Sequence, residues 1–406
     1  MDFPYSRLRR WPDVEADNLQ AHDATDLLLV ERALSLGIDG GEAVVIGDDY
    51  GAITLALAAA GLDGIRVHQD LATGRRALAR NADELGLAGF SAHELDVALL
   101  GGARLVLLQL PKALAELDEI ADAVARWAAP DVVLVAGGRV KHMTIAQNEV
   151  LGRRFAHVQA QHAERKSRLV VASEPRPVPA EPPFPVTAQH EGLVLVAHGG
   201  AFAGAKLDIG TRFLLEVLGP GGSQLSIGSQ LSIDATPQGE GAPEAADPGN
   251  PCCVVNDHGS SPTPIVVDLG CGTGALAASY ALAHPDARVI ATDRSAAAVA
   301  SARATAAANG VADRVTVMHD DAGSQIADAS ADVVLLNPPF HLGTSVHTGA
   351  ATRLFEAAAR ILRPGGELVT VYNSSLGYRG ELTRLIGTTE QLQRTPKFTV
   401  TRSVRR

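Results

Sequence analysis

The segment VVDLGCGTG, residues 266–274, decides the fold, because it joins a buried strand to a glycine-rich turn. The strand ends near the carboxylate of Asp268, and three glycines follow it, Gly270, Gly272 and Gly274. Because glycine has no Cβ atom, a ligand can approach the backbone of such a turn closely. The N-terminus of the helix that follows favours a carboxylate or a phosphate at the same place. The segment therefore predicts a ligand site at the end of a parallel strand.

Strand-like and helical segments alternate on both sides of this turn, as they do in parallel α/β sheets. Around the turn we expect strands at 264–270, 287–293, 314–321, 331–337 and 366–372, and a helix at about 348–362. Earlier in the chain the same plan predicts strands at 43–47, 65–70, 104–110 and 131–138, and a helix at about 112–128. The fold class is therefore α/β, with two tandem Rossmann-like domains.

The two halves align with one another, which indicates an internal duplication. Laid over one another, Gly47–Gly51 falls on Gly270–Gly274, Asp70 on Asp293, and Gln109–Lys112 on Asn337–Phe340. Where the second copy has GCGTG, the first has GDDYG, and where the second has NPPF, the first has QLPK. Asp48 and Asp49 thus bring side chains and negative charge into the turn, and we expect the first copy to be degenerate.

Composition shifts mark the domain boundaries. The stretch SEPRPVPAEPPFPV (173–186) contains six prolines, which disfavour a helix or a central strand. We expect a first domain at 1–175, a proline-rich linker at 176–186 and a second domain at 187–406. Within the second domain, LVLVA and LDIGTRFLLEVL (207–218) predict a strand and a helix before the sheet, and 220–262 is a Gly, Pro and Ser-rich insertion that we expect to be flexible.

The composition excludes several protein classes. Of the 406 residues, 46% are hydrophobic and 20% are charged, which excludes a disordered or fibrous chain. Three cysteines, one of them in the glycine turn, provide neither a disulfide framework nor a four-ligand metal site. No apolar leader and no run of 18 uncharged apolar residues is present. We expect a cytoplasmic monomer without a metal or a membrane segment.

The net charge of −11 argues mildly against sequence-indifferent binding of nucleic acid, because phosphate contacts need basic side chains. The charge is uneven, however. Residues 139–168 carry seven Lys and Arg against two Glu, and 391–406 carry five without an acidic residue. Charge runs of this kind are often ordinary solvated faces, so they become candidate phosphate contacts only when a motif supports them.

The D-x-G-x-G-x-G spacing of the turn resembles that of S-adenosylmethionine-dependent methyltransferases of the Rossmann-like class. The resemblance implies that the loop holds the methionine portion of the cofactor. Asp293 would then accept from two ribose hydroxyls, and Asp320 or Asp321 from the adenine amino group, although each Asp also suits a helix cap or a turn. Gly270, Gly272 and Ala275 also fit a dinucleotide-binding pattern, so nicotinamide chemistry is an alternative.

The string LLNPPFH (335–341) discriminates between these alternatives. Two prolines at the end of a strand remove two N–H donors and keep the backbone extended, so that acceptors face the ligand crevice. The Asn337 side-chain oxygen and the Pro338 carbonyl can accept from one NH2 group, and the Phe340 ring can stack on a flat base. Such a site positions a planar amine in line with a methyl donor. A dehydrogenase would leave these residues without a role.

With these motifs, the sequence resembles the bacterial ribosomal RNA guanine-N2 methyltransferases over nearly its whole length. The residues that carry the resemblance are the duplication, LDIGTRFLLEVL, NPPFH and RPGGELVTVYNSSLGY (363–378). It implies that Asn337, Pro338 and Phe340 hold the guanine, with Pro339 beside them. His341 either assists or is a polar strand-end residue. Asn373 matches a position near the site or caps a turn, and Asp208 and Thr211 match a segment beside the cofactor, where Asp208 also suits a helix cap.

The resemblance also gives the degenerate first domain a role in RNA recognition, and its AGGRVKHM segment (136–143) favours the large-subunit branch. The implied partner is ribosomal RNA or a ribosomal subunit. We expect phosphate contacts among the basic residues of the first domain, Lys112, Arg139, Lys141, Arg153, Arg154, Lys166 and Arg168. Two other hypotheses remain: methylation of a protein glutamine or an adenine N6, which present the same kind of amine, and an RNA-binding or folding-assistance protein with a vestigial catalytic domain.

Overall fold

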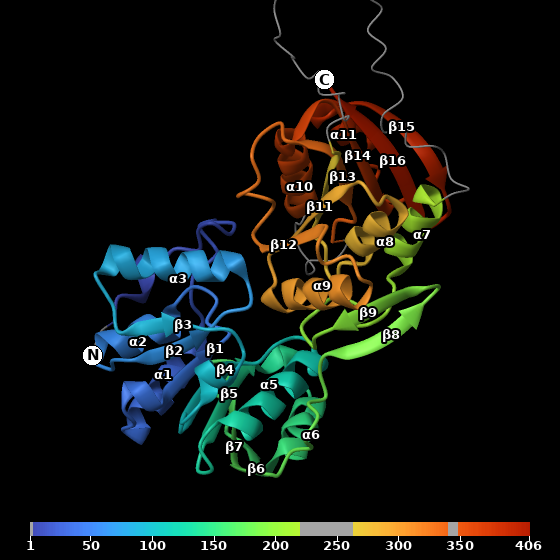
Figure 1. Ribbon diagram of the computed structural model, residues 1–406. Helices are drawn as coiled ribbons and strands as arrows, with labels where there is room; N and C mark the ends of the chain where they lie inside the picture. Colours follow the sequence, from blue (N-terminus) through green and yellow to red (C-terminus); the bar gives the residue numbers. More distant parts are fainter. Residues whose placement is uncertain (1–2, 220–262, 340–347) are drawn as a thin grey trace, which may run out of the picture.

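The protein is described by a computed structural model that covers residues 3–219, 263–339 and 348–406. Each half of the chain forms a seven-stranded sheet covered by helices, and Figure 1 shows the two halves as separate lobes in contact. The two-domain, Rossmann-like α/β prediction is confirmed.

The first sheet has the strand order β3-β2-β1-β4-β5-β7-β6. Its strands are β1 (Ala43–Ile46), β2 (Ile65–His68), β3 (Phe90–Ala92), β4 (Leu105–Gln109), β5 (Val133–Arg139), β6 (Phe155–Ala160) and β7 (Ser167–Pro175). Its helices are α1 (Ala24–Leu36), α2 (Ala52–Ala59), α3 (Ala72–Leu85), α4 (Val97–Leu100), α5 (Leu114–Trp127) and α6 (Ile145–Arg154), with short 3-10 turns at Tyr5–Arg7, Gly40–Glu42 and Val140–His142. Val45 packs on one face of the sheet and Val44 and Ile46 on the other, which explains the continuous apolar run of β1.

The second sheet repeats this order as β12-β11-β10-β13-β14-β16-β15. Its strands are β10 (Ile265–Leu269), β11 (Arg288–Asp293), β12 (Val315–His319), β13 (Ala331–Leu336), β14 (Leu362–Asn373), β15 (Gly387–Arg394) and β16 (Phe398–Arg405). Its helices are α7 (Ile209–Leu218), α8 (Ala275–Ala283), α9 (Ala296–Ala308), α10 (Thr348–Ile361) and α11 (Arg379–Leu385). The hairpin of β8 (Val186–His190) and β9 (Leu193–Ala197) lies against α9 (Figure 1), and Asn309 at the end of α9 exchanges hydrogen bonds with the backbone of Val194 in β9.

Both sheets are mixed, although the sequence patterns indicated only parallel strands. β7 and β16 run antiparallel to β5 and β14, and each is paired with a further antiparallel strand, β6 or β15. The basic tail 391–406, which we treated only as a charge run, forms the end of β15 and all of β16. The β6–β7 and β15–β16 hairpins lie at the margins of the sheets, and their strands alternate polar and apolar residues. This alternation predicts a strand less clearly than the continuous apolar run of a strand that is buried on both faces.

The two copies superpose as predicted at two of the three positions. Gly51 and Gly274 each precede the helix that follows the first parallel strand of their sheet. Gln109 ends β4, and Asn337 directly follows the equivalent strand β13. The match of Asp70 with Asp293 is wrong by one residue. Gly47 N donates to His68 O as Gly270 N donates to Thr292 O, so the residue equivalent to Asp293 is Gln69. The oxygen of Gln69 accepts from Leu71 N, just as Asp293 accepts from Ser295 N.

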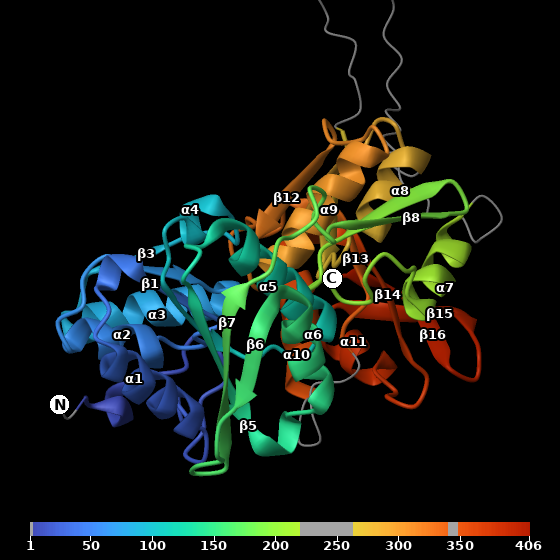
Figure 2. The same cartoon turned by 90° about the horizontal axis from the view of Figure 1, so that it is seen from below.

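The domains touch through a backbone pairing at the segments that follow β2 and β11. Ala72 N donates to Arg294 O at 2.8 Å, and Ala296 N donates to Asp70 O at 2.9 Å. Because these segments are equivalent in the two copies, the contact is approximately two-fold symmetric. Figure 2 shows the same two lobes from below, and α5 lies next to the second domain, where its Glu119 pairs with His198. None of the described helices is long and apolar enough to cross a bilayer.

Candidate active site

The glycine turn opens toward a ligand at two of its three glycines. All three have positive φ, +82° at Gly270, +53° at Gly272 and +77° at Gly274. A Cβ atom added to Gly270 or Gly272 would meet none of the described residues within 4 Å, whereas one on Gly274 would lie 2.9 Å from the Cα of Ala302 in α9. The first two glycines therefore border open space, and the third allows α8 and α9 to pack closely.

Asp268 lies beneath this turn with part of its carboxylate unused. Its side chain is buried, Oδ2 accepts from Ala277 N at 3.0 Å, and Oδ1 has no partner among the described residues. Burial raises the pKa of Asp268 to about 7, with a further contribution from the charge of Asp293. A buried acceptor of this kind is suited to a positively charged or hydrogen-donating ligand group.

Asp293 connects the glycine turn to the start of α9. Its Oδ2 accepts from Gly272 N and its Oδ1 from Ser295 N, both at 2.9 Å. Burial raises the pKa of Asp293, while these two N–H donors lower it. Asp293 therefore acts as a turn and cap residue, one of the two roles that the sequence left open, and the ribose contact stays a prediction.

Asp320 and Asp321 follow β12 and are both engaged in ion pairs. Asp320 accepts from Arg76 of the first domain, and Asp321 accepts from Arg353 of α10. The Asp320 side chain is completely buried and the Asp321 side chain is 6% exposed. The turn role foreseen for these residues is thus visible, and Asp320 N also donates to Asp293 O at 2.9 Å.

Asn337 is held by α7 in one orientation. Its Nδ2 donates to Asp208 Oδ2 at 3.1 Å and to Thr211 Oγ1 at 2.9 Å. Because a carboxylate only accepts, the amide nitrogen must face Asp208, so the amide oxygen points away. Asn337 Oδ1 is buried and has no hydrogen-bond partner among the described residues. The strand end thus presents one unsatisfied acceptor.

Asp208 also caps α7, since its Oδ2 accepts from Gly210 N at 2.9 Å and from Thr211 N at 3.3 Å. The sequence did not single out Gly210. A Cβ atom there would lie 3.1 Å from Asp208 Oδ2 and 3.2 Å from Asn337 Oδ1. The small residue therefore leaves space for the amide, and the one signal available in the sequence was a glycine in the first turn of an amphipathic helix.

In the segment LLNPPFH (335–341), Pro338 is buried and Pro339 is exposed. Phe340 and His341 lie outside the described residues. Asn373 ends β14, two strands from β10, and its Oδ1 accepts from Ser375 N at 3.1 Å and from Ser375 Oγ at 2.9 Å. Its oxygen is therefore committed to a turn, the second of the two roles that the sequence allowed.

The first copy closes the equivalent site with its own side chains. The carboxylate of Asp48 is buried and accepts from Gly51 N, Ile53 N and Thr54 N, at 3.0, 3.1 and 2.8 Å. It occupies the N-terminus of α2, where a ligand carboxylate would otherwise bind. Gln109 donates to Asp26 of α1, as Asn337 donates to Asp208. Asp48 thus fills the helix N-terminus in this copy, although Gly47, Gln109 and Pro111 still border an open cavity.

The predicted phosphate contacts lie at opposite edges of the first sheet. Lys112 follows β4 and Arg139 ends β5. Lys166 and Arg168 lie at the adjacent end of β7, and Lys141 is close to Arg139 in the chain. Arg153 and Arg154 lie at the far edge, where β6 begins. Both are paired with Asp118 of α5, and Arg154 is 16% exposed and also contacts Asp122. These two arginines stabilise the packing of α5 on α6.

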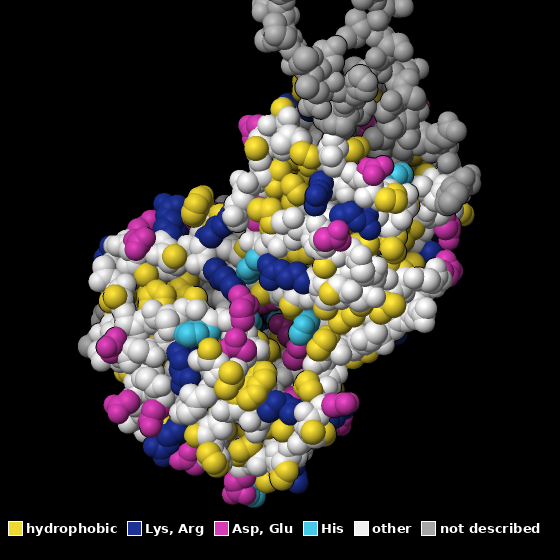
Figure 3. Space-filling view, viewed as in Figure 1, with side chains coloured by type: hydrophobic (Ala, Val, Ile, Leu, Met, Phe, Trp, Pro, Cys, Tyr) yellow, Lys and Arg dark blue, Asp and Glu magenta, His cyan; other side chains and the backbone are white. Residues whose placement is uncertain are grey.

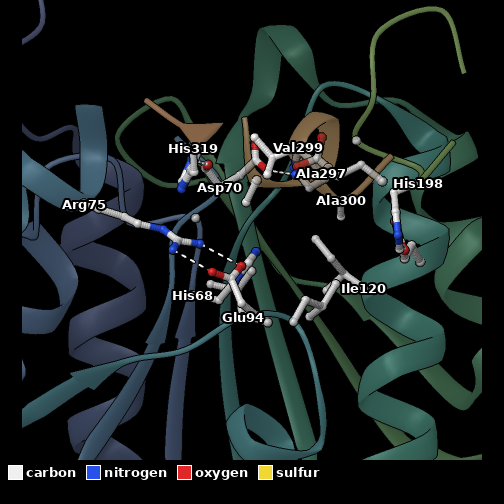
Figure 4. A pocket seen from close by; sticks show the side chains of 18 of the residues that line it. His68, Asp70, Arg75, Glu94, Ile120, His198, Ala297, Val299, Ala300 and His319 are labelled. Carbon is white, nitrogen blue, oxygen red and sulfur yellow. Dashed lines mark hydrogen bonds and ion pairs between the residues drawn. The ribbon is translucent and has the colours of Figure 1, made fainter. Parts of the chain in front are cut away.

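A cavity of about 360 Å³ lies between the domains, over the carboxyl edge of the first sheet. Figure 3 shows it as a hollow in which acidic, basic and histidine side chains gather, and Figure 4 shows its walls from nearby. Two pairs of its charged groups are in contact, Arg75 with Glu94 at 2.7 Å and His198 with Glu119 at 2.6 Å, whereas burial raises the pKa of Glu116 in the same wall to about 7. None of the residues predicted for catalysis or cofactor binding lines it. The described residues contain no group of three or more His, Cys, Asp or Glu arranged to hold a metal ion.

Comparison with known proteins identifies the family. Residues 2–176 match the RLMG N-terminal domain, and residues 255–402 match the methyltransferase small domain. "Ribosomal RNA large subunit methyltransferase G" of Streptomyces coelicolor is 33% identical, covering 98% of this chain and 97% of that protein. The protein of the same name from Pseudomonas aeruginosa is also 33% identical, with the same coverage. The chain belongs to the ribosomal RNA large subunit methyltransferase G family.

Members of this family are methyltransferases, and this chain is an enzyme of that class. The fold has a solved counterpart over nearly its whole length. The T. thermophilus 16S rRNA N2 G1207 methyltransferase, solved in complex with AdoMet and guanosine, has a TM-score of 0.70 and 21% sequence identity, and the match covers 95% of this chain and 92% of that one. The likeness establishes the shared two-domain fold.

Proposed function

We propose that the protein transfers a methyl group from S-adenosylmethionine to the exocyclic N2 of a guanine in large-subunit ribosomal RNA. The observation that carries this proposal is the buried oxygen of Asn337, directly after β13, which has no hydrogen-bond partner in the part of the chain that the structure describes. The family to which the chain belongs and the name of its relatives support the choice of substrate. With this substrate, the enzyme would work in the cytoplasm, and we expect it to act as a monomer.

The residues around the glycine turn fit the proposed cofactor. Among the described residues, Gly270 and Gly272 border open space and Asp268 has an unused buried oxygen. Asp293 ends β11, and Asp320 follows β12. We assign the glycine turn with Asp268 to the methionine portion of the cofactor and Asp293 to the ribose. Asp320, with Asp321 beside it, is assigned to the adenine. S-adenosylmethionine supplies a methyl group activated by its positively charged sulfur.

Asn337 positions the methyl acceptor. Its Oδ1 and the carbonyl of Pro338 accept from the two hydrogens of one exocyclic amine, whose lone pair is otherwise spread into the aromatic ring. Two acceptors favour a pyramidal nitrogen, localise the lone pair and stabilise the positive charge that develops there. The reaction then needs no strong base. Phe340 as a stacking residue and His341 as a second contact remain predictions.

The first domain positions the RNA. We propose phosphate contacts from the basic residues at the carboxyl edge of its sheet, Lys112, Arg139, Lys141, Lys166 and Arg168. Of these, Lys112, Lys141 and Lys166 are exposed, which leaves their ammonium groups available to a phosphate. Arg153 and Arg154 are left out of this surface because acidic partners hold them at the other edge.

Substitution of Asn337 by alanine tests the proposal. We expect Asn337→Ala to abolish methylation of ribosomal RNA while calorimetry still detects binding of S-adenosylmethionine, because only the substrate acceptor is lost. Asn373→Ala is the matched control, since the amide oxygen of Asn373 is already used by Ser375, and it should keep measurable turnover. Retained turnover in Asn337→Ala would reject the role assigned to this residue.

The substrate itself is tested by incubating labelled cofactor with separate ribosomal subunits, free ribosomal RNA and release factors. We expect label in guanine after complete digestion of large-subunit RNA to nucleosides. Label that appears in a protein glutamine or in adenine would instead favour the two other amines that suit such a site.

A further inference from the structure

The first domain caps the helix that begins next to Asp293. The first three N–H groups of α9 have no partner within the helix. Ala296 N donates to the backbone oxygen of Asp70 and Ala297 N to Asp70 Oδ1, both at 2.9 Å. Figure 4 shows Asp70 directed at Ala297 from the neighbouring domain. Only Ala298 N is capped from within the second domain, by Ser295 Oγ at 3.2 Å.

The same contact holds the turn between Asp293 and α9 on its other side. Ala72 N donates to Arg294 O at 2.8 Å. His319 Nε2 lies 2.9 Å from Asp70 O and 2.8 Å from Arg294 O. Because both neighbours are carbonyl oxygens, this ring nitrogen carries the proton and donates to them. The residues after Asp293 are therefore fixed by groups from both domains.

Arg76 connects the first domain to Asp320. Its Nη2 donates to Asp320 Oδ1 at 2.5 Å, while Ser324 Oγ and Gln325 N donate to the same carboxylate at 2.6 and 2.8 Å. Burial alone would raise the pKa of Asp320, but these hydrogen bonds outweigh it and hold the pKa below its ordinary value. Asp320 is thus an ionised, buried carboxylate, and its only ion-pair partner among the described residues comes from the other domain.

We infer that Asp70 and Arg76 of the first domain are positioning residues for the cofactor site of the second. They hold the turn after Asp293 and the carboxylate of Asp320 in the geometry that receives the adenosine portion of the cofactor. The inference rests on the proposed function, because that function assigns Asp293 and Asp320 to the cofactor. The degenerate domain thereby contributes to cofactor affinity in addition to RNA recognition.

The test is calorimetric titration of S-adenosylmethionine into the full-length protein. For Asp70→Ala and Arg76→Ala we expect the dissociation constant to rise about tenfold, the effect of losing one charge-assisted hydrogen bond. Steady-state kinetics should show the same rise in KM for the cofactor, with kcat and KM for the RNA unchanged. Asp70→Asn keeps the Oδ1 acceptor and should restore most of the affinity.

Arg80→Ala is the matched control. Arg80 lies one turn further along α3 and pairs with Glu84 of the same helix, so its loss should leave cofactor affinity unchanged. Wild-type affinity in both Asp70→Ala and Arg76→Ala would overturn the inference. So would an Asp70→Asn variant as weak as Asp70→Ala, because the loss would then not follow the hydrogen bond. Failure of the wild-type protein to bind the cofactor would instead refute the proposed function.

Discussion

At the scale of single residues, the site depends on which polar atoms are left without partners. Asn337 uses both amide hydrogens on α7 and keeps its oxygen free, and Asp268 uses one oxygen and keeps the other. Buried polar atoms without partners are rare, because each costs about 1–3 kcal/mol. Among the described residues these two atoms lie on adjacent strands, and we propose that a cofactor and an amine substrate complete their hydrogen bonding.

The pKa of Asp268, which burial raises to about 7, predicts a pH dependence of cofactor binding. A cationic ligand stabilises the ionised carboxylate, so the pKa of Asp268 falls on binding, and below pH 7 binding must release a proton. We expect the affinity for S-adenosylmethionine to be constant above pH 7.5 or so and to fall by up to about tenfold per pH unit below 6.5 or so. Calorimetry in buffers of different ionisation enthalpy measures the proton release.

Asp268→Asn is the control for this effect, because it keeps the hydrogen-bonding shape and does not titrate. We expect this variant to bind more weakly and without the same pH dependence. An affinity of the unmodified protein that is constant from pH 6 to pH 8 would contradict the assignment of Asp268 to the cofactor.

At the scale of elements, the catalytic geometry depends on how closely α7 approaches the end of β13. Gly210 is buried, and a Cβ atom there would meet both Asp208 and Asn337. We expect Gly210→Ala to lower kcat by about tenfold while the melting temperature stays the same or rises, because alanine favours helix by about 1 kcal/mol. Single-turnover methylation and thermal unfolding measure the two effects separately.

Gly380→Ala provides the comparison for this substitution. Gly380 lies in α11, and a Cβ atom there meets nothing within 4 Å. It should gain the same helix propensity without a change in kcat. A Gly210→Ala enzyme as active as the Gly380→Ala enzyme would show that the space beside Asn337 is not required.

The glycine turns show how one element serves two purposes. A Cβ atom on Gly274 would clash with Ala302 of α9, and one on the equivalent Gly51 would lie 2.7 Å from Leu78 of α3. Helix packing excludes a Cβ atom at Gly274, and the positive φ of both residues favours glycine at this position in each copy. The open positions Gly270 and Gly272 distinguish the second copy, because Asp48 fills the corresponding turn in the first.

At the scale of the whole molecule, we propose that the second copy carries the chemistry and that the first contacts the RNA. Lys112→Ala and Lys166→Ala alter exposed side chains at the carboxyl edge of the first sheet. We expect each to weaken binding of large-subunit RNA and to lower the slope of log affinity against log salt concentration by about one, as for one lost phosphate contact. Filter binding across a range of salt concentrations measures this slope.

Arg153→Ala serves as the comparison, because Arg153 is at the other edge and is paired with Asp118. Its salt dependence should match that of the unmodified protein. A larger effect from Arg153→Ala than from Lys112→Ala would place the RNA on the opposite face of the first domain.

The sequence alone determined the α/β class, the duplication and the acceptor motif, because buried parallel strands, glycine turns and Asn-Pro-Pro-Phe are local patterns with local causes. It also indicated that Asp48 and Asp49 bring side chains and charge into the turn of the first copy, and Asp48 fills the N-terminus of α2 there. It did not reveal the antiparallel margins of the sheets, whose alternation is weak, or that Gln69 is the residue equivalent to Asp293.

Only the tertiary structure decided which polar atoms of the site remain free. Asn337 owes its orientation to Asp208 and Thr211, more than a hundred residues earlier, and Asp320 owes its ion pair to Arg76. Hydrogen-bond partners that are distant in sequence leave no periodic signal, because their pairing depends on how the two sheets are brought together. The same reason hid the capping of α9 by Asp70 across the domain contact.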